Sequence, residues 1–109
     1  MATFYNNITG STGVDIELLA PGVHESGIKS ILLTNTHSSA DATVSLFIQK
    51  LSTDATASET YYMLSTVAIP ADTSLLLDNP SMLSFNNLIY GLYLTVGSSD
   101  TLDVIINGE

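Results

Sequence analysis

The chain has 109 residues, of which 45% are hydrophobic, and it contains no cysteine. This length predicts one domain, residues 1–109, whose core forms without disulfides or a metal. Without thiols, disulfide frameworks, zinc–thiolate sites and thiol catalysis are excluded. Eleven carboxylates against two lysines give a formal charge of −9. That charge argues against nucleic-acid and membrane-surface partners.

The N-terminal residues 1–13 are expected to form an extended arm that begins with the short segment Thr3–Ile8. The following segment Val14–Leu18 alternates apolar with acidic residues. This alternation predicts a half-buried strand whose carboxylates face solvent and discourage edge-to-edge pairing.

The stretch Gly27–Leu51 forms the centre of the predicted core. Its apolar residues are concentrated in Ile28–Leu33 and Val44–Ile48, and the small polar segment Asn35–Ala42 between them has the composition of a surface connection. Both blocks are short and rich in β-branched residues, which favours strands over helices. They are joined either as a hairpin or as an arch. Because apolar residues stand at consecutive positions, we expect both strands to be central in a sheet and covered on both faces.

The rest of the chain also predicts strands separated by turns. Gly91 stands inside one of them, which indicates a bulge or close packing by a neighbour. About seven or eight strands with regular turns predict an all-β, two-layer antiparallel β-sandwich, either jelly-roll-like or immunoglobulin-like. The further strands are Thr60–Ile69, Leu75–Leu77, Leu88–Val96 and Thr101–Asn107.

Few residues suggest catalysis. The two histidines, His24 and His37, stand in predicted loops, and no nucleophile elbow of the G-x-S-x-G type is present. Asp100 and Asp103 are a conceivable carboxylate pair for glycoside hydrolysis, but the chain has no tryptophan on which a sugar would stack. We therefore expect no enzyme activity.

Metal binding is also not expected. Asp residues in or beside predicted loops could supply calcium ligands, but no D-x-D-x-D-G loop is present, and single aspartates in turns more often bond their own backbone. We expect neither a metal nor another cofactor. The aspartates concerned are Asp41, Asp54, Asp72, Asp78 and Asp100.

Four segments carry a resemblance to a known family: Gly27–Thr36, Thr43–Ile48, Val67–Leu77 and Asp100–Ile106. Together they resemble the small β-sandwich virion proteins of tailed bacteriophages, especially those of marine and cyanobacterial phages. One departure is the turn after Pro70, where glycine is expected and Ala71-Asp72 stands. The resemblance implies a non-enzymatic virion part, most simply a capsid decoration or cement protein on the outer head surface.

From the resemblance we expect a virion location, with the major capsid protein or other virion proteins as partners. We also expect a homo-oligomer whose weak contacts sum by avidity. A neck, tail or fibre component and a carbohydrate-binding adhesive module are alternatives; the latter needs an exposed aromatic platform or loop calcium. A hydrolase would need a histidine beside a nucleophile. The residues expected to contact partners are Phe4, Tyr5, His37, Asp41 and Asp54.

Overall fold

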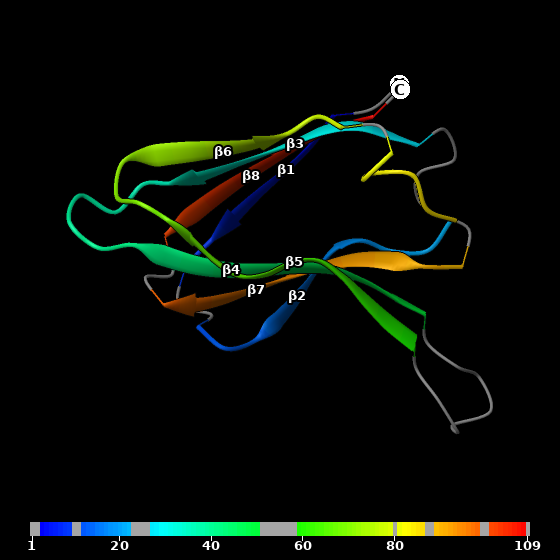
Figure 1. Cartoon of the computed structure of the whole chain (residues 1–109), viewed down its shortest axis with the longest axis horizontal. Coiled ribbons are helices and arrows are strands. Elements are labelled where there is room, and N and C mark those ends of the chain that lie inside the picture. Colours follow the sequence, from blue (N-terminus) through cyan, green and yellow to red (C-terminus); the bar gives the residue numbers. More distant parts are fainter. Residues whose placement is uncertain are drawn as a thin grey trace.

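The computed structural model describes residues 3–9, 12–22, 27–50, 59–79, 81–86, 89–98 and 101–108. These residues form eight strands in two antiparallel sheets that face each other (Figure 1). Sheet A has the order β1-β8-β3-β6 and sheet B the order β2-β7-β4-β5. The predicted antiparallel β-sandwich is confirmed. The strands are β1 (Thr3–Ile8), β2 (Asp15–Leu19), β3 (Ile28–Asn35), β4 (Ala42–Lys50), β5 (Glu59–Ile69), β6 (Thr73–Leu77), β7 (Gly91–Ser98) and β8 (Leu102–Gly108).

The strand order decides between the two sandwich types that the sequence left open. Strand β1 neighbours β8, β2 neighbours β7, β3 neighbours β6 and β4 neighbours β5. This nested pairing of eight strands is that of the jelly roll. In an immunoglobulin-like sandwich the first two strands share a sheet, whereas here β1 and β2 lie in different sheets.

The core lies between the sheets. Ile31 and Leu33 of β3 and Leu46 of β4 are fully buried, and both strands are central in their sheets as predicted. The expectation that both faces of these strands are covered is wrong for β3. Its residues alternate between buried and partly exposed, with Leu32 on the outer face, because none of the described strands forms a further layer over sheet A.

An arch, and not a hairpin, joins β3 to β4, since the two strands belong to different sheets. The arch follows Asn35, the last residue of β3, whose polar side chain is fully buried. The amide Nδ2 donates to the carbonyls of Ala40 (2.9 Å) and Ile69 (3.0 Å), and Oδ1 accepts from the N–H of His37 (3.0 Å). All these bonds hold the arch in one conformation.

The β5–β6 connection crosses between the sheets beside this arch, at the left end of Figure 1. Its turn residue Asp72 has φ of +53°, so an aspartate adopts the left-handed conformation for which the resemblance leads one to expect glycine. The N–H of Asp72 donates to the carbonyl of His37 at 3.1 Å. The two crossovers are therefore fastened to each other.

Irregular pairing changes the alternation along β5. The register with β4 shifts on both sides of Leu46, as it does at a β-bulge. Leu64 is consequently opposite Leu46, and it packs on the core together with Met63. Strict alternation would place Leu64 and Met63 on opposite faces, but the extra residue at the bulge moves the following side chains to the other face.

Gly91 begins β7, three residues later than the sequence predicted for this strand. A Cβ at this position would lie 3.0 Å from Cε1 of Tyr93 and 3.1 Å from the carbonyl oxygen of Leu19. Of the two explanations for this glycine, close packing is the one the structure shows.

Among the described residues there is no helix long and apolar enough to cross a bilayer.

Candidate functional site

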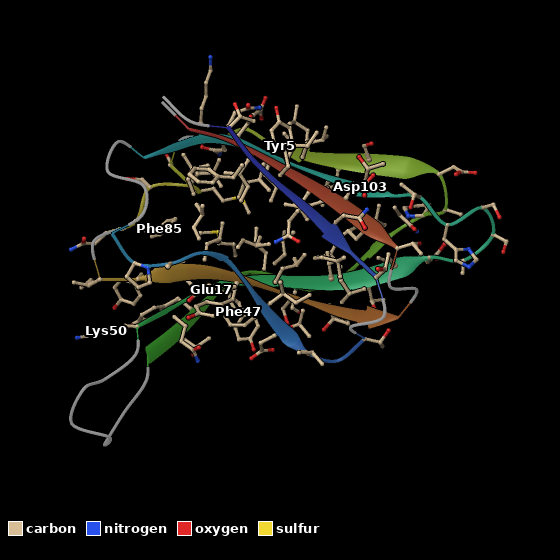
Figure 2. The ribbon with its side chains drawn as sticks, turned by 180° about the vertical axis from the view of Figure 1, so that it is seen from behind. Tyr5, Glu17, Phe47, Lys50, Phe85 and Asp103 are labelled. Carbon is tan, nitrogen blue, oxygen red and sulfur yellow. The ribbon has the colours of Figure 1, made fainter. Side chains whose placement is uncertain are left out.

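A row of apolar side chains crosses all four strands on the outer face of sheet A. Its members, in strand order, are Tyr5 (β1), Ile105 (β8), Leu32 (β3) and Leu76 (β6). The side chains at its two ends are the most exposed, 76% for Tyr5 and 54% for Leu76. Figure 2 shows Tyr5 on the side of sheet A that faces away from sheet B. We call these four residues the apolar row.

Polar rows border the apolar row on both sides. On one side the amide of Asn7 donates to the carboxylate of Asp103 at 2.5 Å, and the hydroxyls of Thr34 and Ser74 are bonded at 2.8 Å. These side chains satisfy one another across the strands. The apolar row is therefore the part of this face that gains most by being covered. The polar row on the other side consists of Thr3, Asn107 and Ser30, bonded in series.

An open groove of about 370 Å³ lies over β1 and β8, where the apolar row meets the polar side chains of Asn7 and Asp103. In Figure 2 the labelled Tyr5 and Asp103 mark its position. This volume is near the lower limit of small-molecule sites, and it suits a protruding side chain of a partner. The groove is lined by Tyr5, Asn6, Asn7, Asp103, Val104 and Ile105.

The first two predicted contact residues, Phe4 and Tyr5, have opposite environments. Strand β1 is paired with β8 along its whole length, so Thr3–Ile8 is an edge strand of sheet A and not a detached arm. Side chains alternate along a strand, and Phe4 packs against the core while Tyr5 faces outward. Phe4 is partly buried against the core, and contact through it stays a prediction. Contact through Tyr5 stays a prediction.

His37 and Asp41, two further predicted contact residues, belong neither to the apolar row nor to the groove lining. His37 stands in the β3–β4 arch, where Nδ1 accepts from the N–H groups of Ser39 (3.1 Å) and Ala40 (3.0 Å). Its imidazole thus fixes the arch. Asp41 is exposed just before β4, and Asp54 lies outside the described residues. Partner contact through these three residues stays a prediction.

Metal-ligating side chains do not gather in the described part of the chain. No group of three or more His, Asp or Glu residues there is placed to hold a metal ion. His24 and Asp100 lie outside the described residues, and the carboxylate of Asp103 accepts from Asn7 on an open face.

Three members of the apolar row, Leu32, Leu76 and Ile105, were not singled out from the sequence. The signal was present in the runs Ile31–Leu33 and Leu75–Leu77, which are apolar at consecutive positions. We interpreted such runs as strands covered on both faces. In a two-layer sandwich whose outer faces are exposed, runs of consecutive apolar residues instead mark the places where apolar side chains stand on the outer face.

No protein-family model, no curated protein and no solved structure matches this chain. The jelly roll is shared by viral capsid domains, lectins and cupins, and a fold by itself does not define a function. The functional argument therefore depends on the surfaces of this molecule.

Proposed function

We propose that this protein is a non-enzymatic virion structural protein of a tailed bacteriophage, a decoration protein that attaches to the outer surface of the head. The observation that carries this proposal is the apolar row, which crosses the whole of sheet A with Tyr5 and Leu76 largely exposed. The resemblance of four segments to small phage virion proteins is the reason for proposing that the assembly is a virion.

The size of the face supports attachment in many copies. Four strands about 4.8 Å apart and about six residues long present a flat area of about 400 Å². A stable one-to-one interface buries about 800 Å² on each partner. One such contact is therefore weak, and a repeated lattice of sites, as on a capsid, makes many weak contacts effective through avidity when the subunits are linked.

Charge indicates the kind of partner. With a formal charge of −9, two copies of this chain repel each other at low salt, and Asp103 lies beside the groove. A capsid surface with an apolar knob and a neutral or basic rim complements sheet A better than a second copy does. The expected homo-oligomer, if it forms, would then use another surface, and native mass spectrometry measures its size.

Quantitative mass spectrometry of purified particles tests the location. A large copy number, in fixed proportion to the major capsid protein, is the result expected of decoration. A small copy number would instead indicate a neck, tail or fibre component. Absence of the protein from the particles would reject every virion role.

Rebinding to particles that lack the protein tests the surface. The double substitution of Tyr5→Ala with Leu76→Ser is expected to abolish rebinding, because it removes both exposed ends of the apolar row. Tyr62→Ala, which removes an equally large exposed side chain from sheet B, is the matched control and should rebind normally. Normal rebinding of the double variant would exclude sheet A as the attachment surface.

A further inference from the structure

A second row of side chains crosses the outer face of sheet B. Its members are Glu17 (β2), Tyr93 (β7), Phe47 (β4) and Tyr62 (β5), which stand opposite one another in register. We call them the aromatic row. Figure 2 shows Glu17 and Phe47 close together on the side of sheet B away from sheet A.

The aromatic row covers Phe47 from both sides. The ring of Tyr93 is stacked on it at 5.7 Å between centroids, with 12° between the planes, and the ring of Tyr62 lies at 5.1 Å with 40°. Phe47 is therefore only 2% exposed although it faces away from the core, whereas Tyr62 is 59% exposed. Tyr62 is the one largely exposed aromatic ring of the row.

Contacts behind Tyr62 hold the row in place. The hydroxyl of Tyr93 donates to Oε2 of Glu17 at 2.9 Å, and its ring passes so close to Gly91 that a Cβ there would lie 3.0 Å from Cε1. Phe47 rests on this fixed ring, and Tyr62 rests on Phe47. A ring that is held before a ligand arrives loses little conformational freedom on binding.

Hydrogen-bonding groups lie on both sides of the aromatic row. Beside Tyr62, Nε2 of Gln49 donates to the hydroxyl of Thr60 at 3.0 Å. On the other side of the row, the hydroxyl of Thr95 donates to Asp15 at 2.6 Å. A carboxylate accepts about four hydrogen bonds, so Glu17 keeps acceptor capacity beyond its bond from Tyr93. These groups can exchange some of their bonds for bonds to ligand hydroxyls.

This combination fits a sugar better than it fits a protein. A pyranose ring has an apolar C–H face that stacks on an aromatic ring and a rim of hydroxyls that donate and accept, whereas the centres of protein interfaces are depleted of charge. Glu17 of the aromatic row and Asp15 beside it both carry carboxylates, and their negative charge disfavours binding of anionic sugars. From β2 to β5 the face spans about 14 Å, which suits an oligosaccharide.

We propose that the outer face of sheet B binds a neutral hexopyranose chain, with one sugar stacked on Tyr62 and its neighbours bonded to Gln49, Thr60 and Glu17. This site is on the opposite face from the apolar row. It does not depend on the proposed attachment through sheet A.

Amide chemical-shift titration of the ¹⁵N-labelled full chain tests the proposal. The probes are cellohexaose, mannohexaose and N-acetylchitohexaose, each up to about 10 mM, which detects dissociation constants in the millimolar range. We expect saturable shifts centred on Tyr62, Gln49 and Thr60 with at least one of these neutral probes. An alginate hexamer, which is anionic, should cause none.

Variants assign the effect to the aromatic ring. Tyr62→Ala should weaken binding about tenfold, Tyr62→Phe should retain it, and Tyr5→Ala is the matched control on sheet A. Since Tyr62 is largely exposed, the alanine variant is expected to fold, and its spectrum verifies this. The proposal is overturned if no neutral probe causes shifts, if alginate binds equally well, or if Tyr62→Ala binds like the wild type. Loss of sugar binding with normal particle binding, or the reverse, separates this site from the attachment surface.

Discussion

The side-chain amide of Asn35 donates a hydrogen bond to the main-chain carbonyl of Ile69 at 3.0 Å. Asn35 is the last residue of β3 in sheet A, and Ile69 is the last residue of β5 in sheet B. The same amide also holds Ala40 in the arch. One buried side chain thus joins both crossovers at this end of the sandwich, where the chain passes from one sheet to the other.

Asn35→Leu is expected to lower the free energy of unfolding by about 3 kcal/mol. Leucine fills a similar volume but removes the partner of the buried Ile69 carbonyl and of the partly buried Ala40 carbonyl and His37 N–H. A buried group left without a partner costs about 1–3 kcal/mol. Urea unfolding followed by circular dichroism measures the change. Asn7→Ala, which removes an exposed hydrogen-bonded amide, is the control and should cost less than about 1 kcal/mol. Equal effects of the two substitutions would contradict the structural role of Asn35.

Alternation and turn residues sufficed to predict most of the fold. The strands predicted at Val14–Leu18 and Thr101–Asn107 lie within one residue of β2 and β8, because each has a clear period of two. The choice between hairpin and arch was not available from the sequence. It depends on where Asn35 finds its partners, and Ile69 is 34 residues away.

Neighbouring leucines of β3 should differ sharply in their effect on stability. Leu33 is fully buried in the core, and Leu32 lies partly exposed on the outer face of sheet A. Leu33→Ala is expected to cost about 3 kcal/mol, whereas Leu32→Ala should cost about 1 kcal/mol because part of its surface already meets water. Paired urea titrations compare the two variants. Equal costs would show that the outer face of β3 is covered after all.

The proposed attachment surface, the apolar row, was only partly predictable from the sequence. Tyr5 stood out as an aromatic residue in an edge segment, but Leu32, Leu76 and Ile105 could not be distinguished from core residues. Their exposure depends on whether a third layer covers sheet A. The aromatic row was also not predictable from the sequence, because Phe47 and Tyr62 are opposite each other only through the shifted register of β4 with β5.

Thr66 occupies a backbone conformation that suits its residue type poorly. Its φ is +53°, in the left-handed region, and its N–H donates to the hydroxyl of Ser45 at 3.0 Å. A β-branched residue in this region costs about 1–2 kcal/mol. Thr66→Asn keeps the N–H and tolerates this conformation, so we expect it to raise the free energy of unfolding by about 1 kcal/mol. The neighbouring exposed substitution Ser65→Asn should change it by less than about 0.5 kcal/mol. A lower denaturation midpoint for Thr66→Asn than for Ser65→Asn would count against this strain.

Tyr93 should make the stability of the sandwich sensitive to alkaline pH. Burial, the hydrogen bond to Glu17 and the negative charge of Glu17 together raise the pKa of Tyr93 above its ordinary value. The neutral phenol is thus favoured in the folded state. Its contribution is complete below the unfolded-state pKa of about 10 and is lost as the pH rises through the higher pKa of the folded state.

Tyrosinate absorbance measured during an alkaline titration should show a late ionisation step that belongs to Tyr93. Tyr93→Phe should remove this late step. Glu17→Gln should move it to lower pH, because a neutral amide still accepts the hydrogen bond but no longer opposes the phenolate with a negative charge. Tyr62→Phe removes a largely exposed tyrosine and is the control that leaves the late step in place. If Glu17→Gln did not change the position of the late step, the charge of Glu17 would not be acting on Tyr93.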